Sequence, residues 1–199
     1  MTLPKRKSPR LEGYNYSASG AYFITICTHD HEHLLSNIVG AIHESPENIL
    51  TAYGEIVKNI IDQLPQRFNI EINKYVIMPN HIHFIIIIKD DEERAIRESP
   101  LQCHRSVMSK VIGYLKMNAS KQIHLTNPKK KIWQRLYHDH IIRGEKDYQK
   151  IWEYIDTNVI SWEKDCFYSS ETEQWNSLLR FHMCRIFSFI FYFPHNYIG

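Results

Sequence analysis

The chain has 199 residues, of which 43% are hydrophobic and 23% are charged, and its formal net charge is +2. This length fits one domain, and this hydrophobic content is sufficient for a buried core. The four cysteines lie far apart and form no Cys-x-x-Cys pair, which argues against a disulfide framework or a structural zinc knuckle and suits a reducing compartment. No apolar segment follows the basic N-terminus, so we expect no signal peptide, no membrane partner and a cytoplasmic location.

Three regions are expected along the chain. Residues 1–19 form a basic arm, residues 20–168 form the domain, and residues 169–199 form an atypical aromatic and apolar tail. The tail is too short before Pro194, and too interrupted by charge, to be a convincing membrane span. Positive charge concentrates between Arg105 and Lys150, where eleven Lys/Arg face three acids. Such a cluster attracts phosphate backbones, although a solvated basic face gives the same count.

The first half of the domain alternates strand and helix patterns. Residues 21–28 are β-branched and aromatic and predict a strand. His29, His31 and His33 follow in a polar turn, where histidines are more often solvent-facing than metal-bound. A second strand is expected to include residues 38–42, followed by a polar turn at residues 45–48. Apolar residues then recur at helical spacing from Ala52 to Leu64, and Pro65 is expected to end that helix.

The second half repeats this alternation. Residues 70–78 and 81–88 predict two strands joined by the tight turn Pro79-Asn80, hence an antiparallel hairpin. The sequence predicts a loop at residues 89–104, a helix at 106–123, a short strand at 132–142 and a third helix at 145–158. This order predicts an α+β fold of the ferredoxin-like kind, an antiparallel sheet with helices on one face.

Two histidines interrupt the start of the apolar strand 81–88. At spacing i and i+2, His81 and His83 point to the same face of the strand and make half of a metal site. On the third helix, Tyr154 and Asn158 are four residues apart and share a face. Each feature has an ordinary alternative: a hydrogen-bonded histidine pair at a sheet edge, and a tyrosine at the core boundary. Tyr148 and Tyr137 lie in the same region, and spacing alone does not choose among the three tyrosines.

If these side chains meet, their chemistry suits a phosphodiester substrate. A divalent ion held by His81, His83 and the Asn158 oxygen would polarise the phosphate, and the Tyr154 hydroxyl would attack phosphorus. A mixed nitrogen and oxygen ligand set favours Mg²⁺ or Mn²⁺ over structural zinc. The imidazoles must be neutral to bind the ion, so activity should fall as the pH drops through the histidine range.

The motifs resemble those of a known family. Residues 78–83 (MPNHIH) are similar to the HUH motif, histidine–hydrophobe–histidine, of the single-tyrosine transposases. Residues 10–14, 21–28, 133–143 (WQRLYHDHIIR) and 154–158 (YIDTN) extend the likeness to the REP-associated tyrosine transposases over about residues 10–168. Single HUH motifs are moderately specific, whereas the three motifs in this order are strongly so.

The resemblance implies a ferredoxin-like fold, a divalent metal, and cleavage and rejoining of single-stranded DNA near hairpins through a 5′-phosphotyrosine. Carried over by motif, His81 and His83 would be metal ligands, Tyr154 the nucleophile and Asn158 the third ligand or its support. His140 and Arg143 match family positions with a structural or DNA-contacting role. The chain departs from the family pattern at Val159, where proline is usual; this change would let the helix run on. The likeness also stops near Ser169.

Hairpin DNA is the expected partner, and charge clustering assigns its contacts to the basic arm and to Lys129, Lys130, Lys131, Arg135 and Arg143. The sequence leaves open a monomer or a homodimer, and therefore whether Tyr154 works with its own chain's histidines.

The sequence also leaves other functions open. Histidine-triad hydrolases fit weakly because Ile85 stands where a third histidine is needed, and phosphodiesterases with a repeated His-x-Thr or His-x-Ser motif need a second copy that is absent. A replication or conjugation initiator with HUH chemistry is generally larger or carries a helicase. The main alternative is a domesticated or inactive relative that binds hairpin DNA without cutting it.

Overall fold

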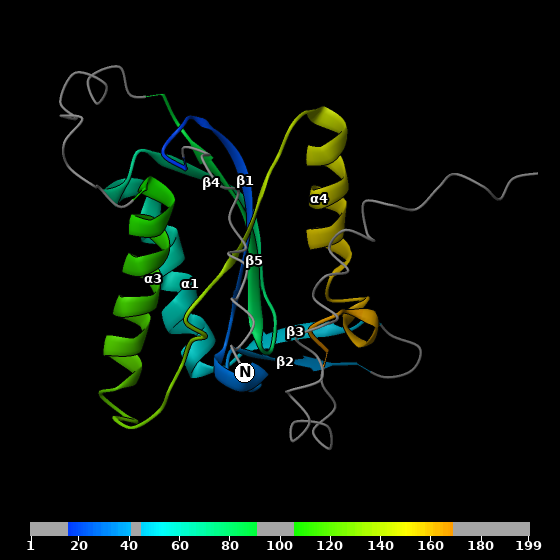
Figure 1. Ribbon diagram of the computed structural model, residues 1–199. Helices are drawn as coiled ribbons and strands as arrows, with labels where there is room; N and C mark the ends of the chain where they lie inside the picture. The colour runs from blue at the N-terminus through cyan, green and yellow to red at the C-terminus, as the bar shows by residue number, and fades with distance from the viewer. Residues whose placement is uncertain (1–15, 41–44, 91–105, 169–199) are drawn as a thin grey trace, which may run out of the picture.

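A four-stranded antiparallel sheet forms the centre of the computed structural model, in the order β4-β5-β1-β6 (Figure 1). Its strands are β4 (Ile70–Ile77), β5 (His81–Ile88), β1 (Gly20–Cys27) and β6 (His138–Ile141). The two central strands pair along their whole length, from Gly20 opposite Ile88 to Cys27 opposite His81. This pairing follows from their β-branched and aromatic composition and places the histidine end of β5 beside the end of β1.

The structure describes residues 16–40, 45–90 and 106–168. Most of the expected basic arm, most of the expected loop 89–104, and the whole of the atypical tail lie outside these described residues. Within them, no helix has the length and apolar character needed to cross a membrane.

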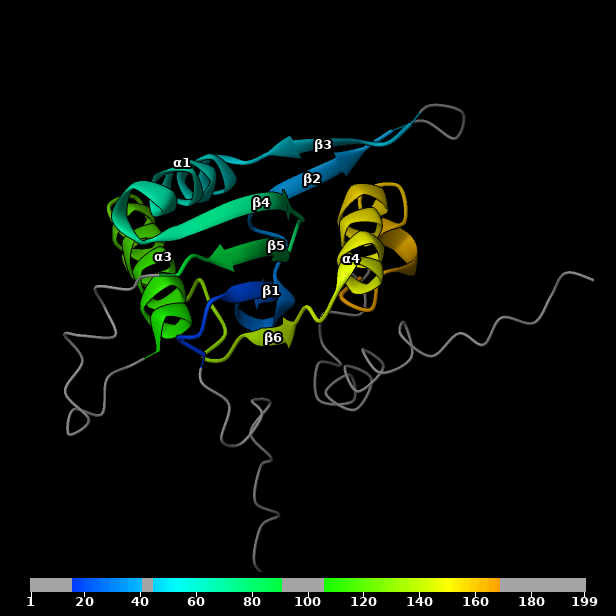
Figure 2. The same cartoon turned by 90° about the horizontal axis from the view of Figure 1, so that it is seen from above.

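Helices cover both faces of the sheet. Helices α1 (Ala52–Arg67) and α3 (Val107–Ile123) pack on one face with Ile82, Phe84 and Ile86 of β5. Helix α4 (Glu145–Thr157) lies on the opposite side (Figure 2). There Ile151 and Ile155 pack against Phe23 and Ile85, the side chains that alternate to the other face.

The α+β fold class is confirmed, and the strand order with its two crossing helices is that of a ferredoxin-like sheet. The expectation that the helices share one face holds for α1 and α3 only. Helix α4 differs because its own apolar stripe needs a surface to bury, and the second face of the sheet offers Phe23 and Ile85.

Local predictions differ from the structure at three places. Residues 45–48 are not simply a turn, because β3 (Glu47–Leu50) pairs with β2 (Ser36–Val39) in a separate two-stranded sheet. Pro65 does not end α1, which continues to Arg67; proline's φ suits a helix, and the Phe68 N–H still bonds the Leu64 carbonyl. Of the expected strand 132–142, only His138–Ile141 pairs regularly, while Trp133 forms an isolated bridge with Thr28. Two 3₁₀ turns complete the elements, η1 (His29–His31) and η2 (Trp162–Lys164).

The segment before α1 fixes the turn that precedes the histidines. Thr51 caps α1 through the Gly54 N–H, and its hydroxyl also donates to the Leu34 carbonyl at 2.6 Å. The N–H groups of Leu34 and Leu35 both donate to the Pro79 carbonyl, at 2.9 and 3.0 Å. The turn before β5 is therefore held by the backbone of Leu34 and Leu35, and Thr51 in turn holds Leu34.

Two helical glycines give a matched test of this arrangement. A Cβ at Gly54 would lie 2.0 Å from the Leu35 carbonyl oxygen, whereas a Cβ at Gly113 of α3 would meet nothing within 4 Å. We expect Gly54→Ala to lower the free energy of unfolding by about 1–3 kcal/mol or more, because backbone must move. Gly113→Ala should raise it by roughly 0.5–1 kcal/mol through helix propensity. Urea denaturation of both variants measures the difference, and equal changes would contradict the close contact at Gly54.

Candidate active site

The two histidines of β5 lie side by side beneath α4. Both side chains are 0% exposed, and their ring centroids are 4.4 Å apart. Phe167, from the segment after α4, covers them with its ring centroid 4.6 Å from that of His81 and 5.8 Å from that of His83. The shared face expected from the i, i+2 spacing is therefore present, in a fully enclosed position.

Hydrogen bonds determine which nitrogen of His81 carries a proton. The Asn80 amide nitrogen donates to the Phe167 carbonyl at 2.8 Å, so the amide oxygen of Asn80 is left to accept. That oxygen lies 2.9 Å from His81 Nδ1, which must then be the protonated nitrogen. His81 Nε2 keeps its lone pair and has no hydrogen-bond partner within the described parts of the chain. A buried imidazole held in this tautomer is the usual state of a histidine metal ligand.

His83 is oriented by β1 and reaches the tyrosine of α4. Its Nδ1 lies 2.8 Å from the Thr25 hydroxyl, and its Nε2 lies 3.2 Å from the Tyr154 hydroxyl. Because a threonine hydroxyl either donates or accepts, this contact supports both neutral tautomers of His83. Thr25 thus fixes the ring in place in either tautomer. While the Tyr154 hydroxyl donates its proton to Asp165, His83 Nε2 donates to the Tyr154 oxygen.

Tyr154 and Asn158 meet a carboxylate that follows α4. The Tyr154 hydroxyl donates to Asp165 Oδ2 at 2.9 Å, and the Asn158 amide donates to the same oxygen at 2.8 Å. Asn158 is buried, and since its nitrogen serves Asp165, its oxygen is left without a partner among the described residues. The absence of proline at position 159 predicted that the helix would continue. Helix α4 nevertheless ends at Thr157. The backbone after Asn158 instead turns through η2 and brings Asp165 back to the site.

Asp165 is the site residue that sequence reasoning missed. Ligand atoms of His81, His83 and Asp165 all lie within 4.8 Å of one another, the one such group of three or more among residues 16–40, 45–90 and 106–168. Asp165 Oδ1 accepts a hydrogen bond from the Phe167 N–H at 2.7 Å, and this bond closes the turn over the histidines. The signal in the sequence was the segment 162–165 (WEKD), which follows the pattern of the resembled family after Asn158 but does not separate Asp165 from Glu163.

The competing tyrosines lie elsewhere. The Tyr148 hydroxyl accepts a hydrogen bond from the Asn73 amide of β4 at 2.9 Å. Tyr137 packs with the core on the α1 and α3 face, 6.0 Å from the Lys116 ammonium. Of the three tyrosines that spacing could not separate, Tyr154 is the one placed beside the histidines.

The loop histidines and the remaining motif positions pack outside this group. The His31 ring stacks on Phe167 with centroids 6.0 Å apart, and His33 contacts Trp162 at 5.8 Å. His140 Nε2 lies 2.9 Å from Asp147, whose carboxylate also accepts the backbone N–H of Arg143. These two loop histidines are therefore half-buried against aromatic rings and do not simply face solvent as expected, and His140 makes a structural contact.

Comparison with known proteins gives the family. No protein-family model matches the chain. An uncharacterized protein of Haemophilus influenzae is 36% identical over 173 residues, which cover 82% of this chain and 93% of that protein. This chain belongs to the same family. Among solved structures, a REP-associated tyrosine transposase bound to a REP hairpin matches with a TM-score of 0.51 at 21% identity, over 75% of this chain and 72% of that one. The family's shared fold with the REP-associated tyrosine transposases, expected from the motifs, is therefore confirmed.

Burial controls the protonation of the site. Desolvation lowers the pKa of His81 to about 4, partly offset by the Asp165 carboxylate, and lowers the pKa of His83 well below its ordinary value. Desolvation, followed by the nearby charge of Asp165, raises the pKa of Tyr154. At neutral pH the site therefore contains two neutral imidazoles and a protonated phenol.

These pKa values predict acid sensitivity of the metal-free protein. Unfolded histidine binds its proton near pH 6.5, whereas folded His81 does so near pH 4. Between these values the unfolded state binds more protons, so the free energy of unfolding falls with decreasing pH, by up to about 1.4 kcal/mol per pH unit for each such histidine. Urea denaturation at pH 7, 6 and 5 should give a shallower decline for His81→Gln than for the wild type. Parallel curves for the two proteins would contradict the low pKa.

The donors present fit a divalent metal ion. The unpartnered His81 Nε2 and Asn158 oxygen are buried polar atoms that a cation would satisfy, and His83 and Asp165 add a nitrogen and a carboxylate. A bound ion would polarise a phosphate and stabilise charge that develops on it.

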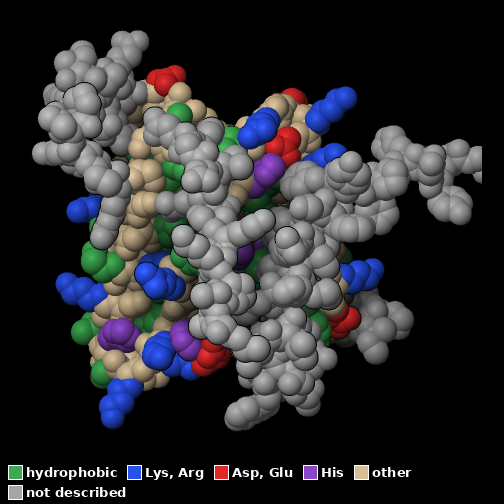
Figure 3. Space-filling view, in the orientation of Figure 1, with side chains coloured by type: hydrophobic (Ala, Val, Ile, Leu, Met, Phe, Trp, Pro, Cys, Tyr) green, Lys and Arg blue, Asp and Glu red, His purple; other side chains and the backbone are tan. Residues whose placement is uncertain are grey.

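The expected DNA-contacting residues are mostly at the surface. Lys129, Lys131, Arg135 and Arg143 are exposed, and Lys130 is half-buried in an ion pair with Glu32. Lys, Arg and His side chains gather at the lower left of the molecule, over the end of α3 (Figure 3). Positive charge is thus available beside the C-terminal end of α3.

Proposed function

We propose that this protein is a metal-dependent transposase that cleaves and rejoins single-stranded DNA near hairpins through a 5′-phosphotyrosine on Tyr154. The observation that carries the proposal is the Tyr154 hydroxyl, 3.2 Å from His83 Nε2 in a site with a second buried imidazole. The solved transposase with this fold was bound to a REP hairpin, which supports the substrate class by analogy of fold.

Metal binding is assigned to His81 and His83 together with an oxygen from Asp165 or Asn158. Asn80 and Thr25 hold the two imidazoles from their Nδ1 side. Such outer contacts fix the ring orientation that a metal ligand needs. Mixed nitrogen and oxygen donors favour Mg²⁺ or Mn²⁺.

The reaction is a transfer of the phosphoryl group to tyrosine. The Tyr154 oxygen forms a bond to phosphorus as the bond from phosphorus to the 3′ oxygen breaks, which leaves a free 3′-hydroxyl and a 5′-phosphotyrosine. Asp165 Oδ2, which already accepts the phenolic hydrogen bond, is placed to take the proton that Tyr154 must lose. The covalent bond conserves the energy of the broken phosphodiester, so a second 3′-hydroxyl can be joined without ATP.

DNA contacts are assigned to Lys129, Lys130, Lys131, Arg135 and Arg143, with a contribution from the basic arm. Lysine and arginine near a phosphate backbone release counterions, so these residues should make binding depend on salt. The basic cluster at the end of α3 supports this assignment (Figure 3).

The test is a cleavage and joining assay on single-stranded hairpin oligonucleotides from repeats near the gene, with Mg²⁺ or Mn²⁺ and without ATP. The expected result is a shortened strand, a protein–DNA adduct on denaturing gels, and a joined product when a second 3′-hydroxyl strand is added. Cleavage that proceeds in EDTA, or that releases both ends free without any adduct, would contradict the proposal.

A second candidate is a relative that binds hairpin DNA without cutting it. The complete burial of His81 and His83 under Phe167 favours it, because a phosphodiester reaches these groups only if that cover moves. Binding of hairpin DNA with no adduct under either metal would establish this alternative.

A further inference from the structure

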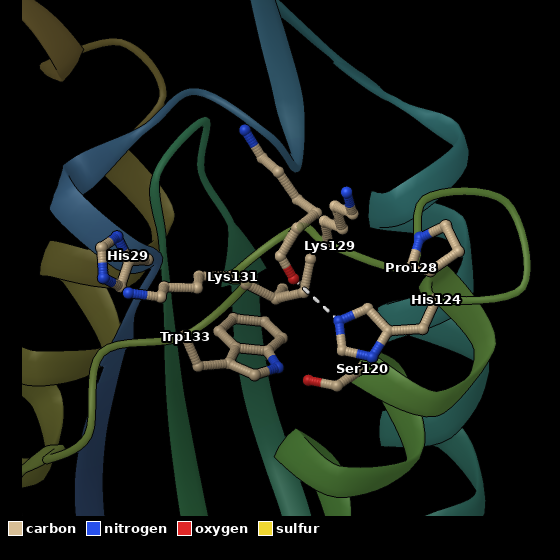
Figure 4. Close-up of a pocket in the computed structure, with 9 residues that line it drawn as sticks. His29, Ser120, His124, Pro128, Lys129, Lys131 and Trp133 are labelled. Carbon is tan, nitrogen blue, oxygen red and sulfur yellow. Dashed lines mark hydrogen bonds between the residues drawn. The ribbon is translucent and has the colours of Figure 1, made fainter.

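A hollow of about 340 Å³ opens between the end of α3 and the segment that follows it (Figure 4). Its volume falls in the range of about 300–1,000 Å³ typical of small-ligand sites. The lining combines basic, hydroxyl and aromatic side chains: His29, Ser120, His124, Pro128, Lys129, Lys130, Lys131, Ile132 and Trp133. None of these side chains belongs to the histidine–tyrosine site described above.

The mouth of the hollow is positively charged. Lys130 is neutralised by its ion pair with Glu32. Lys129 and Lys131 are exposed, and neither forms an ion pair with any residue in the described ranges. His124 donates from Nε2 to the Lys130 carbonyl at 2.7 Å, which holds its ring at the wall of the hollow. Two uncompensated ammonium groups beside an imidazole favour an anionic ligand such as a phosphate.

One wall of the hollow is an aromatic ring held in a fixed position. Trp133 Nε1 donates to the Lys116 carbonyl at 3.2 Å, and Trp133 forms a backbone bridge with Thr28. The Lys116 ammonium in turn donates to the carbonyls of Gln134 and Leu136, at 2.8 and 2.9 Å. Lys131 extends past Trp133 toward His29, while His124 and Ser120 lie on the other side of Trp133 (Figure 4). An aromatic face bordered by lysines is the combination that binds unpaired bases and their phosphates.

A short chain of contacts joins the hollow to the proposed active site. The His29 N–H donates to the Ile132 carbonyl at 2.9 Å, and Thr28 donates through its hydroxyl to the Asn80 carbonyl at 3.0 Å. Gln134, next to Trp133, donates to His31 Nε2 at 2.9 Å. His31 stacks on Phe167, which covers His81. The hollow and the histidine site thus lie on either side of the loop that follows β1.

We propose that this hollow binds one unpaired nucleotide of the DNA strand that flanks the cleavage site, with its base against Trp133 and its phosphate between Lys129 and Lys131. The inference rests on the proposed function, since it assigns part of that substrate to a defined place. It adds a stacking residue, Trp133, and a base-sized site to what charge clustering alone implied.

Photocrosslinking tests the proposal with the full chain. The Tyr154→Phe variant keeps the DNA uncut, and a hairpin oligonucleotide carries 5-iododeoxyuridine at one single-stranded position at a time. One position, or two adjacent positions, should crosslink to Trp133 or His124. Bound DNA that crosslinks only to other residues would overturn the inference and leave the proposed function standing. If no hairpin binds at all, both this inference and the proposed function are wrong. Equal crosslinking by free 5-iododeoxyuridine monophosphate at the same concentration would also overturn the placement of a strand nucleotide.

Affinity measurements provide an independent readout. Replacing both Lys129 and Lys131 by Gln should reduce the slope of log affinity against log salt by about 0.7, the value for the one single-strand phosphate that the two lysines contact. Lys58→Gln with Lys89→Gln removes the same charge from residues paired with Asp62 and Glu71 and should leave the slope unchanged. Trp133→Leu should weaken binding roughly 5- to 150-fold, and Trp133→Phe should retain most of it. An unchanged slope for the double lysine variant would overturn the proposal without depending on Trp133.

Discussion

Replacing Tyr154 by phenylalanine should abolish the protein–DNA adduct and lower the rate of strand cleavage by roughly 10⁴-fold or more, the scale seen when a nucleophile is removed. The change deletes a hydroxyl that lies beside both His83 and Asp165. The fold should persist, because the aromatic ring that packs edge-on against Phe23 at 6.1 Å is retained. Single-turnover cleavage on denaturing gels measures the effect.

Tyr148→Phe is the matched control for this variant. It removes a hydroxyl from the same helix, but one whose partner is the Asn73 amide on β4. We expect it to cleave and form the adduct at a rate close to that of the wild type. Loss of the adduct in Tyr148→Phe with retention in Tyr154→Phe would show that the wrong tyrosine had been assigned.

The second large effect concerns metal binding. His81→Gln should weaken Mn²⁺ binding by more than about 100-fold, since even partners that only support a ligand contribute about 10–100-fold. The reason is the lone pair of His81 Nε2, which is buried, fixed by Asn80 and without another partner in the described residues. Isothermal titration and the electron paramagnetic resonance spectrum of bound Mn²⁺ report this affinity without requiring activity.

Two further variants complete the metal experiment. His140→Gln removes an imidazole that pairs with Asp147 outside the site and should leave the Mn²⁺ affinity unchanged. Asp165→Asn keeps the shape of the side chain but removes its charge, so a comparable loss of affinity would identify the carboxylate as a ligand. A folded His81→Gln protein that binds Mn²⁺ as tightly as the wild type would contradict the assigned ligand set.

The elements that carry the site follow closely from local sequence patterns. The alternation around His81 and His83 places both on one face of β5, and the helical spacing of Ile151 and Ile155 gives α4 its buried stripe. These features are predictable because each depends on residues within one element. The face of the sheet that α4 covers depends on tertiary packing. The prediction that all the helices share one face was wrong for α4.

Asp165 shows why the rest could not be predicted. Its contact with Tyr154 depends on how the chain turns after Asn158, through the residues of η2. No periodicity encodes such a turn, and a single acid near a helix end is common on surfaces. The same reason explains why spacing could not choose among the three tyrosines. Spacing puts Tyr148 and Tyr154 on one helix, but only the packing of α4 on the sheet determines which hydroxyl meets His83 and which meets Asn73.

The closed cover over the histidines also bears on how the site would work. Asp165, Phe167 and Asn80 are joined by hydrogen bonds that hold this cover in place. Under the proposed function, entry of a DNA strand would require those contacts to open, which would expose the two imidazoles and the phenol together. Water is excluded until that point, which strengthens the electrostatic interactions inside the site.

Mapping the covalent adduct by mass spectrometry tests the central claim most directly. Trypsin places the three tyrosines on separate peptides, residues 136–143 for Tyr137, 147–150 for Tyr148 and 151–164 for Tyr154. After reaction with hairpin DNA and Mn²⁺, nuclease digestion should leave a nucleotide remnant on the peptide 151–164, joined through its 5′-phosphate to Tyr154. A remnant on either of the other two peptides, or complete cleavage of the DNA with no modified peptide, would contradict the account.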